Sequence, residues 1–298
     1  MLAAISKFII LDKAPGMSSQ QAIFKLKKLL KIKKIGHTGT LDPLATGVLP
    51  VALNAATKII PYLAEEKKIY QVRGKLGETT NTYDSEGEIL KEADFSGIHR
   101  SDMQKALETF LGEVTQRPPI YSAIKVKGRA LYHYARKQQE VEVPLRKVFF
   151  HQIELNEWDP PFFSLQVECS RGTYIRSLIH DLGLKLGCLA HMVDLRRLQS
   201  GIFKLERSLT LEQIEHDSEA VENAALSLEE CLQHLDSFEL QGEDEWKKIK
   251  NGLISYALQD RLQELIQVPQ TLRVCYQGEF MGLMSLGELA KVEKLRLL

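Results

Sequence analysis

The segment that most constrains the fold is a loop-forming string at residues 36–50, GHTGTLDPLATGVLP. Its first twelve residues contain three glycines and a proline, which favour turns and close backbone approach over regular helix or strand. Asp42 lies between Leu41 and Pro43 in this string. A carboxylate among apolar loop residues loses hydration, which costs free energy unless a cation or donor compensates it. Because an aspartate before proline is also a common turn device, the rest of the sequence has to decide between a turn and a reactive carboxylate.

Strand patterns surround this loop. Residues 8–11, 141–155 and 162–170 are rich in apolar and β-branched side chains and predict strands. Residues 69–76 alternate in polarity, with Tyr70 on the more apolar face, which predicts a half-buried strand.

Helix patterns are interspersed with the strands. Ser18 or Ser19 can cap a helix that runs to about residue 32. Ser101 and Gln104 have the spacing of a capping box for a helix through residue 111, and residues 174–186 predict another helix. Because strands and helices do not follow a βαβ rhythm, we predict an α+β fold with a large, mixed and mainly antiparallel sheet.

An acidic stretch separates the last part of the chain. Residues 205–245 carry thirteen acidic side chains and one arginine. Beyond it, residues 272–276 and 279–286 predict two short strands joined by a two-residue turn. We therefore predict two domains, residues 1–230 and residues 237–298, of which the second is a small β-rich module.

The formal net charge is zero, but the charges are unevenly distributed. The first forty residues contain eight lysines and one acid, and residues 125–147 contain seven lysines or arginines against two glutamates. Such clusters suit a polyanion bound on one face, although solvated surface helices would give the same composition. We predict that six of these cations contact RNA phosphates: Lys13, Lys28, Lys31, Lys125, Lys127 and Arg129.

Composition argues against several other classes of protein. The four cysteines form no C-x-x-C pair and have no histidine at zinc-site spacing, which argues against a disulfide framework or a structural zinc site. No apolar stretch approaches the roughly 18 residues that a membrane-spanning helix needs. We expect a reduced cytoplasmic protein that needs no metal.

The string at residues 36–50 closely resembles the catalytic motif of the TruB family of pseudouridine synthases. Three further strings are similar to other motifs of that family and follow its order: GETTNTYD at residues 77–84, QRPPIYSAIK at residues 116–125 and SRGTYIR at residues 170–176. The likeness extends from about residue 11 to residue 198. One departure is KAPG at residues 13–16, where the family usually has Lys-Pro-x-Gly, so the family's turn geometry does not transfer there.

The resemblance implies that Asp42 is the catalytic carboxylate. It also implies that Arg176 pairs with Asp42, and such a cation keeps a carboxylate ionised in an apolar pocket. Taken alone, Arg176 would be read as a surface arginine in the first turns of a helix.

Four further residues acquire roles from the resemblance. Tyr70 would take part in catalysis by stacking on the target base, and base stacking on an aromatic ring contributes about 1–3 kcal/mol. Tyr174 and Leu195 would line the same pocket. His37 would enter the RNA loop and support the extruded nucleotide, since chemistry on a stacked base requires its extrusion. Without the resemblance, Tyr70 and Leu195 would pass as core residues.

The implied reaction breaks the N1–C1′ bond of uridine, turns the uracil and rejoins it through C5. Because no atom is gained and no electron is transferred, we expect no cofactor. A carboxylate can act as a nucleophile and form a covalent intermediate. Attack of Asp42 on C1′, attack on C6 and assistance in the loss of a ribose proton all remain open.

The favoured hypothesis is a monomeric enzyme that converts uridine 55 in the T stem-loop of tRNA and needs no protein partner. One alternative is the guide-RNA-dependent relative that works inside a ribonucleoprotein. Another is an RNA-binding factor that helps tRNA to fold, either alone or in addition to the modification. The tail resembles the family's PUA-like RNA-binding module, mainly through LRV at residues 272–274 and GEFMG at residues 278–282.

Overall fold

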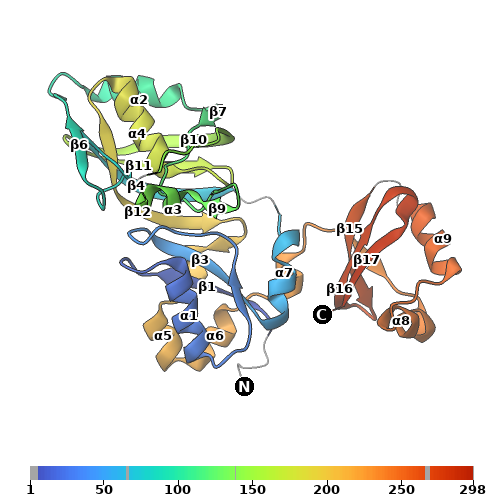
Figure 1. The fold of residues 1–298 in the computed structure, drawn as a ribbon. Helices are drawn as coiled ribbons and strands as arrows, with labels where there is room; N and C mark the ends of the chain where they lie inside the picture. The colour runs from blue at the N-terminus through green and yellow to red at the C-terminus, as the bar shows by residue number, and fades with distance from the viewer. Residues whose placement is uncertain (1–5, 65–66, 138, 266–268, 298) are drawn as a thin grey trace. The chain divides into compact units, whose positions relative to one another are not determined.

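The computed structural model describes residues 6–64, 67–137, 139–265 and 269–297. The chain divides into two compact units, which are described separately (Figure 1). Unit 1 is Met1–Asn54 and Glu65–Ala225, and unit 2 is Ala55–Ala64 and Leu226–Leu298. The sequence patterns gave no sign that residues 55–64 belong with the C-terminal part of the chain.

A mixed sheet forms the centre of unit 1. Its main strands lie in the order β1-β3-β12-β4-β11-β10-β7, with β2 paired to β3 and β13 to β12. Their bounds are β1 Phe8–Lys13, β2 Ile35–His37, β3 Thr46–Leu53, β4 Lys68–Leu76, β7 Gly112–Gln116, β10 Arg146–Asp159, β11 Phe162–Cys169, β12 Ala190–Ser200 and β13 Phe203–Lys204. Within the described part of this sheet, β3 and β12 form the one parallel pair. The predicted α+β fold with a mainly antiparallel sheet is confirmed.

Helices and two hairpins surround this sheet. The helices are α1 Ser19–Leu29, α2 Arg100–Glu108, α3 Leu131–Arg136, α4 Ile175–Leu186, α5 Leu211–His216 and α6 Ser218–Ala224, with a 3-10 turn at Leu205–Arg207. The hairpins pair β5 Glu78–Thr80 with β6 Ile89–Glu92, and β8 Lys125–Val126 with β9 Arg129–Ala130. Helices α1, α5 and α6 lie together near β1, while α2 and α4 lie together near β10 and β12 (Figure 1).

The sequence pattern of β4 predicted its burial well. Tyr70, Val72 and Leu76 are buried, whereas Gln71 and Arg73 on the opposite face are exposed. The buried face joins a continuous apolar core with α1, α2 and α4. Tyr70 therefore belongs to the core and also lines the site described below.

Several predicted boundaries were wrong, including the end of α2 at Glu108 and the end of β10 at Asp159, and three others have identifiable reasons. Helix α1 is capped by Ser18 but stops at Leu29, and Lys31 already has a positive φ of 52°. Helix α2 begins before Ser101, because the backbone N–H of His99 donates to the Asp102 carboxylate, a charged acceptor at the positive end of the helix (2.9 Å). Strand β10 starts only after Pro144, which has no N–H to donate to a ladder.

Unit 2 contains a four-stranded sheet in the order β14-β15-β16-β17. The strands are β14 Ser237–Glu239, β15 Gln270–Tyr276, β16 Glu279–Leu286 and β17 Val292–Leu297. Helices α7 Leu228–Cys231, α8 Gly242–Lys250 and α9 Tyr256–Leu265 accompany it, with 3-10 turns at Asn54–Lys58, Ile60–Tyr62 and Glu288–Ala290. The unit has its own apolar core, which includes Phe238, Ile249 and Met284. The predicted pair of short strands and the small β-rich C-terminal unit are confirmed.

Candidate active site

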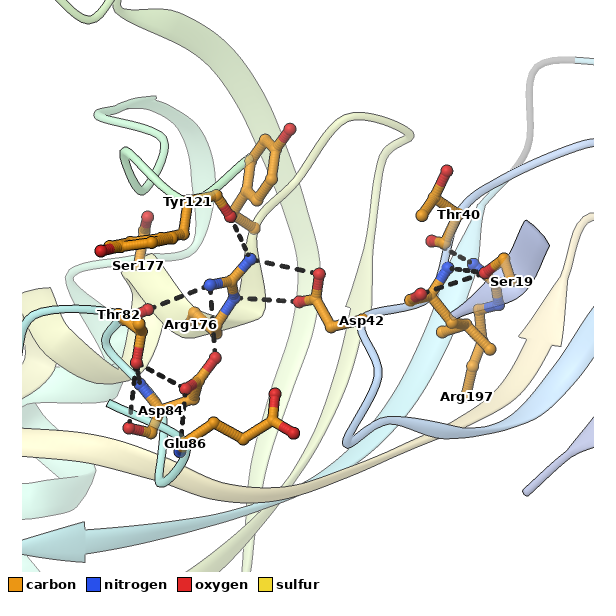
Figure 2. Close-up of polar contacts among 12 residues, drawn as sticks. Ser19, Thr40, Asp42, Thr82, Asp84, Glu86, Tyr121, Arg176, Ser177 and Arg197 are labelled. Atoms are coloured by element: carbon orange, nitrogen blue, oxygen red, sulfur yellow. Dashed lines mark hydrogen bonds and ion pairs between the residues drawn. The ribbon is translucent and has the colours of Figure 1, made fainter. Parts of the chain in front are cut away.

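Asp42 lies in the loop between β2 and β3, and buried polar groups fix this loop. The Ser19 hydroxyl, 1 % exposed, donates to the carbonyl of Leu41 (3.0 Å) and accepts from its N–H (2.8 Å) (Figure 2). On the other side of Asp42, the carbonyl of Pro43 accepts from the backbone N–H of Gly16 (2.9 Å). Backbone atoms on both sides of Asp42 are thus held by the start of α1 and the turn before it.

Lys13 is one of these fixing groups, and its predicted phosphate contact was wrong. The residue is 1 % exposed, and its ammonium donates to the carbonyls of Ala14, Met17 and Pro43 at 2.8–3.1 Å. Burial lowers the pKa of Lys13 to about 8, although Asp42 opposes that shift. A local count of lysines did not reveal that this one faces inward.

Arg197 holds the same loop from β12. It is fully buried, and its guanidinium donates to the carbonyls of Val48 (2.7 Å), Gly39 (3.1 Å) and Thr40 (3.5 Å). No sequence pattern indicated this role, because Arg197 follows another arginine on a strand with little to distinguish the two.

Arg176 is the direct partner of Asp42 (Figure 2). Its Nη2 donates to Oδ1 of Asp42 at 3.2 Å, and its Nε lies 2.9 Å from Oδ2 as an ion pair without hydrogen-bond alignment. Nη1 lies 3.3 Å from Oδ2 of Asp84 and donates to the carbonyl of Thr82 (3.0 Å), while Nη2 also donates to the carbonyl of Tyr121 (2.9 Å). The resemblance predicted the pairing of Asp42 with Arg176, and the structure brings the two together.

Asp84 was not singled out from the sequence. Its side chain is 4 % exposed and accepts from the hydroxyl of Thr82 (2.6 Å) and the N–H of Glu86 (3.1 Å). The available signal was its place at the end of the GETTNTYD string at residues 77–84. Arg176 therefore pairs with two carboxylates: that of Asp84 is buried, and that of Asp42 faces the cavity.

A cavity of about 250 Å³ opens above this ion pair. Five of the predicted site residues line it: Asp42, Tyr70, Tyr174, Arg176 and Leu195. The other residues that line it are Thr40, Leu41, Lys68, Ser122, Ala123, Gly172, Thr173 and Ile175. Strands β4 and β12, the start of α4 and the Asp42 loop thus meet at one concave site with a charged floor and apolar and aromatic walls.

Tyr174 precedes α4 and is held through its backbone. The side-chain amide of Gln116, 2 % exposed, accepts from the N–H of Tyr174 (2.8 Å) and donates to its carbonyl (2.9 Å). Gln116 is the last residue of β7, so this pair of hydrogen bonds ties the start of α4 to the sheet. Gln116 belongs to the QRPPIYSAIK string but had no predicted role of its own.

Burial governs the protonation of the site. It raises the pKa of Asp42 above the ordinary aspartate value, while Arg176 opposes the rise, and 33 % of the Asp42 side chain stays exposed. It raises the pKa of Tyr70 to about 12, so the phenol stays protonated at neutral pH. Tyr70 can therefore supply a neutral ring, and Asp42 is the candidate reactive group.

His37 does not line this cavity. It lies on β2, and its pKa is lowered by burial and by the charge of Arg197, which favours the neutral ring. Its Nδ1 is buried without a hydrogen-bond partner. The predicted role of His37 in the RNA loop stays a prediction.

The five remaining predicted phosphate contacts lie on the surface. Lys28 and Lys31 are exposed at the end of α1, and Lys125, Lys127 and Arg129 are exposed on the β8–β9 hairpin. Their availability to a polyanion agrees with the prediction but does not test it.

Neither a candidate metal site nor a candidate membrane-spanning helix is present in the described part of the chain. Residues 6–64, 67–137, 139–265 and 269–297 contain no group of three or more His, Cys, Asp or Glu side chains arranged to hold a metal ion. No helix in these ranges is long and apolar enough to cross a membrane. All four cysteines are buried.

Comparison with known families gives two adjoining matches. Residues 27–175 match the N-terminal domain of the TruB family of pseudouridylate synthases. Residues 176–238 match the tRNA pseudouridylate synthase B C-terminal domain.

Individual relatives agree. The chain is 41 % identical over 273 residues to the tRNA pseudouridine synthase B of Clostridium tetani, covering 91 % of this chain and 92 % of the relative. It is 47 % identical over 212 residues to that of Pseudomonas aeruginosa, covering 71 % and 69 %. Among solved structures, a chain in the crystal structure of a Cbf5-Nop10-Gar1 complex has a TM-score of 0.68 at 26 % identity, covering 99 % of this chain and 85 % of that one.

Proposed function

The chain belongs to the TruB family of pseudouridylate synthases, and on that premise we propose that it converts uridine 55 in the T loop of tRNA to pseudouridine. The enzyme class and the isomerisation of uridine follow from the family. The position in tRNA and the roles of the residues are the proposed part.

The observation that carries the proposal is the Asp42–Arg176 ion pair at the base of a cavity walled by Tyr70, Tyr174 and Leu195. A flat, uncharged base needs aromatic and apolar walls, and a reacting carboxylate needs a partner that keeps it ionised. Asp84 and two backbone carbonyls hold the guanidinium on the side away from the cavity. It can therefore pair with Asp42 and keep its own position.

The reaction needs one carboxylate and a confined base. The N1–C1′ bond breaks, the uracil turns within the pocket, a C5–C1′ bond forms, and the proton lost from C5 is balanced by one gained at N1. Asp42 would attack C1′ or C6, or assist loss of a ribose proton. In each case Tyr70 and Leu195 would keep the released uracil close to the ribose, which raises the chance of rejoining over escape.

Access to the base requires its extrusion from the RNA loop. A base in a folded RNA loop is cheaper to extrude than one in a duplex. We propose that His37, on β2 next to the Asp42 loop, enters the RNA loop and supports the extruded nucleotide, and that the exposed cations at the end of α1 and on the β8–β9 hairpin contact phosphates. The small β-rich unit 2, proposed to be PUA-like, would add further tRNA contacts.

The main alternative is a guide-RNA-dependent enzyme inside a ribonucleoprotein. The solved chain with 26 % identity comes from a complex with two further proteins, whereas relatives at 41 % and 47 % identity are named tRNA pseudouridine synthase B. The higher identity favours the tRNA enzyme. We further propose that the chain acts in the cytoplasm as a monomer without an obligatory protein partner.

The deciding experiment uses unmodified tRNA transcript labelled with tritium at C5 of uridine. Purified protein is incubated with it in the presence of EDTA, without cofactor or guide RNA, and tritium release and the position of pseudouridine are measured. We expect one modified site, at uridine 55, and no release from a transcript with cytidine there. Modification only after addition of a guide RNA would favour the alternative. Improved tRNA folding without tritium release would indicate a folding factor.

A further inference from the structure

Arg197 is the largest fully buried side chain that has no part in the chemistry proposed above. Within the described part of the chain, no carboxylate forms an ion pair with it. Burying an unpaired guanidinium costs free energy, and carbonyl dipoles offset only part of it. A position that keeps such a charge in the interior needs an explanation beyond packing.

The acceptors of Arg197 lie on both sides of Asp42. Gly39 and Thr40 precede the aspartate, and Val48 follows it on β3. One rigid, planar guanidinium therefore closes the base of the loop that carries the reactive carboxylate. The backbone is equally close, because a side chain at Gly47 would approach the carbonyl oxygen of Arg197 to 2.2 Å.

Arg197 also lies next to the wall of the cavity. It pairs across the sheet with Tyr70, so the two side chains are neighbours on one face, and the positive charge of the guanidinium lowers the Tyr70 pKa against the larger effect of burial. The same side chain thus binds the loop of Asp42 and lies beside the ring proposed to stack on the base.

We propose that Arg197 is a positioning residue for the reaction: its guanidinium fixes the spacing between the Asp42 carboxylate and the Tyr70 ring. The inference rests on the proposed roles of Asp42 and Tyr70. Misplacement of a reacting group by about 1 Å costs roughly 100-fold in rate. Loss of Arg197 should therefore slow the chemical step without weakening capture of tRNA, because Arg197 is buried and touches no RNA.

The test compares Arg197→Met and Arg197→Lys with Arg196→Met. Arg196 is the preceding residue on β12, partly exposed and paired with Asp12 at 2.7 Å, so it controls for loss of an arginine from this strand. Single-turnover rate constants and tRNA affinities are measured well below the melting temperature of each variant. We expect the rate constant to fall roughly 100-fold for Arg197→Met and about tenfold for Arg197→Lys. Affinity should change by less than about threefold, and Arg196→Met should match the parent.

A double-mutant cycle separates positioning from general packing. If Arg197 acts partly through Tyr70, the losses in Arg197→Lys and Tyr70→Phe should not multiply in the double variant. Tyr70→Phe keeps the ring and removes only the hydroxyl, so it should fold even if neither Arg197 variant does, and it too should slow the chemical step without loss of affinity.

The outcomes are distinguishable. An inactive parent would contradict the proposed function itself. With an active parent, the inference is overturned by folded Arg197 variants with parental rate constants, by losses confined to tRNA affinity, by fully multiplicative losses in the cycle, or by a Tyr70→Phe variant as fast as the parent.

Discussion

Asp42 and Asp84 bind the same guanidinium: Arg176 lies 2.9 Å from a carboxylate oxygen of the first and 3.3 Å from one of the second. The two carboxylates differ in exposure, 33 % for Asp42 and 4 % for Asp84. Asp84 is thus the anchor that fixes the cation, and Asp42 is the carboxylate that remains available to a substrate.

Asp42→Asn should abolish pseudouridine formation and leave tRNA binding nearly unchanged. The swap is almost isosteric, so Ser19, Lys13 and Arg197 should still hold the loop, but an amide is a very poor nucleophile or base. We expect the single-turnover rate to fall at least about a thousandfold. Thermal unfolding controls for the lost ion pair with Arg176. A folded variant with turnover near that of the parent would show that Asp42 is not the catalytic carboxylate.

The pH dependence of the rate should report on Asp42. Since its pKa is raised by burial, the ionised fraction falls as pH drops through a midpoint above the ordinary value of about 3.9. The negative charge of Asp84 contributes to that rise. Asp84→Asn removes the charge and should move the acid midpoint of the single-turnover rate to lower pH.

The same substitution should cost stability, about 2 kcal/mol for one lost charge-assisted contact to Arg176. Glu92→Gln, an exposed change on β6, is the matched control and should leave the acid midpoint in place. A midpoint that stays fixed or rises in Asp84→Asn would show that Asp84 does not act on Asp42 through its charge.

Salt dependence should distinguish the surface lysines from the buried one. Replacing Lys28 and Lys31 together by glutamine should flatten the plot of log affinity against log salt by about 1.5 if each contacts one phosphate. Lys13→Met should lower the melting temperature, because three carbonyls each lose a donor, and leave the slope unchanged. An unaltered slope in the double variant would show that Lys28 and Lys31 are solvated surface residues that contact no phosphate.

Removal of residues 237–298 should leave a folded unit 1 that binds tRNA more weakly and retains some turnover. The described residues of the two units have separate apolar cores, and every residue lining the cavity lies before residue 196. The measurements are thermal unfolding, tRNA affinity and single-turnover rate at saturating enzyme. Total inactivity in a demonstrably folded fragment would contradict this division of labour.

The sequence predicted best what depends on local pattern. Alternation in β4 placed Tyr70 on the buried face, and the Gly- and Pro-rich string marked the loop of Asp42. The resemblance supplied the pairing of Asp42 with Arg176 across 134 positions, which no local pattern could have given.

What the sequence missed depends on tertiary contacts between buried polar groups. Ser19, Gln116 and Arg197 look ordinary in their own segments, and each acts on a backbone that is distant in sequence. Lys13 was misjudged for the same reason, because one of its three acceptors, the carbonyl of Pro43, reaches it only once the Asp42 loop folds against β1. Charge counting treats every lysine as solvated, and an inward-facing one violates that assumption.

The parallel pairing of β3 with β12 has a consequence for the order of folding. The contact that closes the base of the Asp42 loop, Arg197 to Val48, joins residues 149 positions apart. Contacts between segments so distant form late, because the entropy of closing the intervening chain opposes them. A nascent chain that ends before β12 carries Asp42 but has neither Arg197 nor Leu195 to complete the pocket. On the roles proposed here, catalytic competence arises only after about two thirds of the chain has been synthesised, and a chain that ends before β12 should not modify RNA.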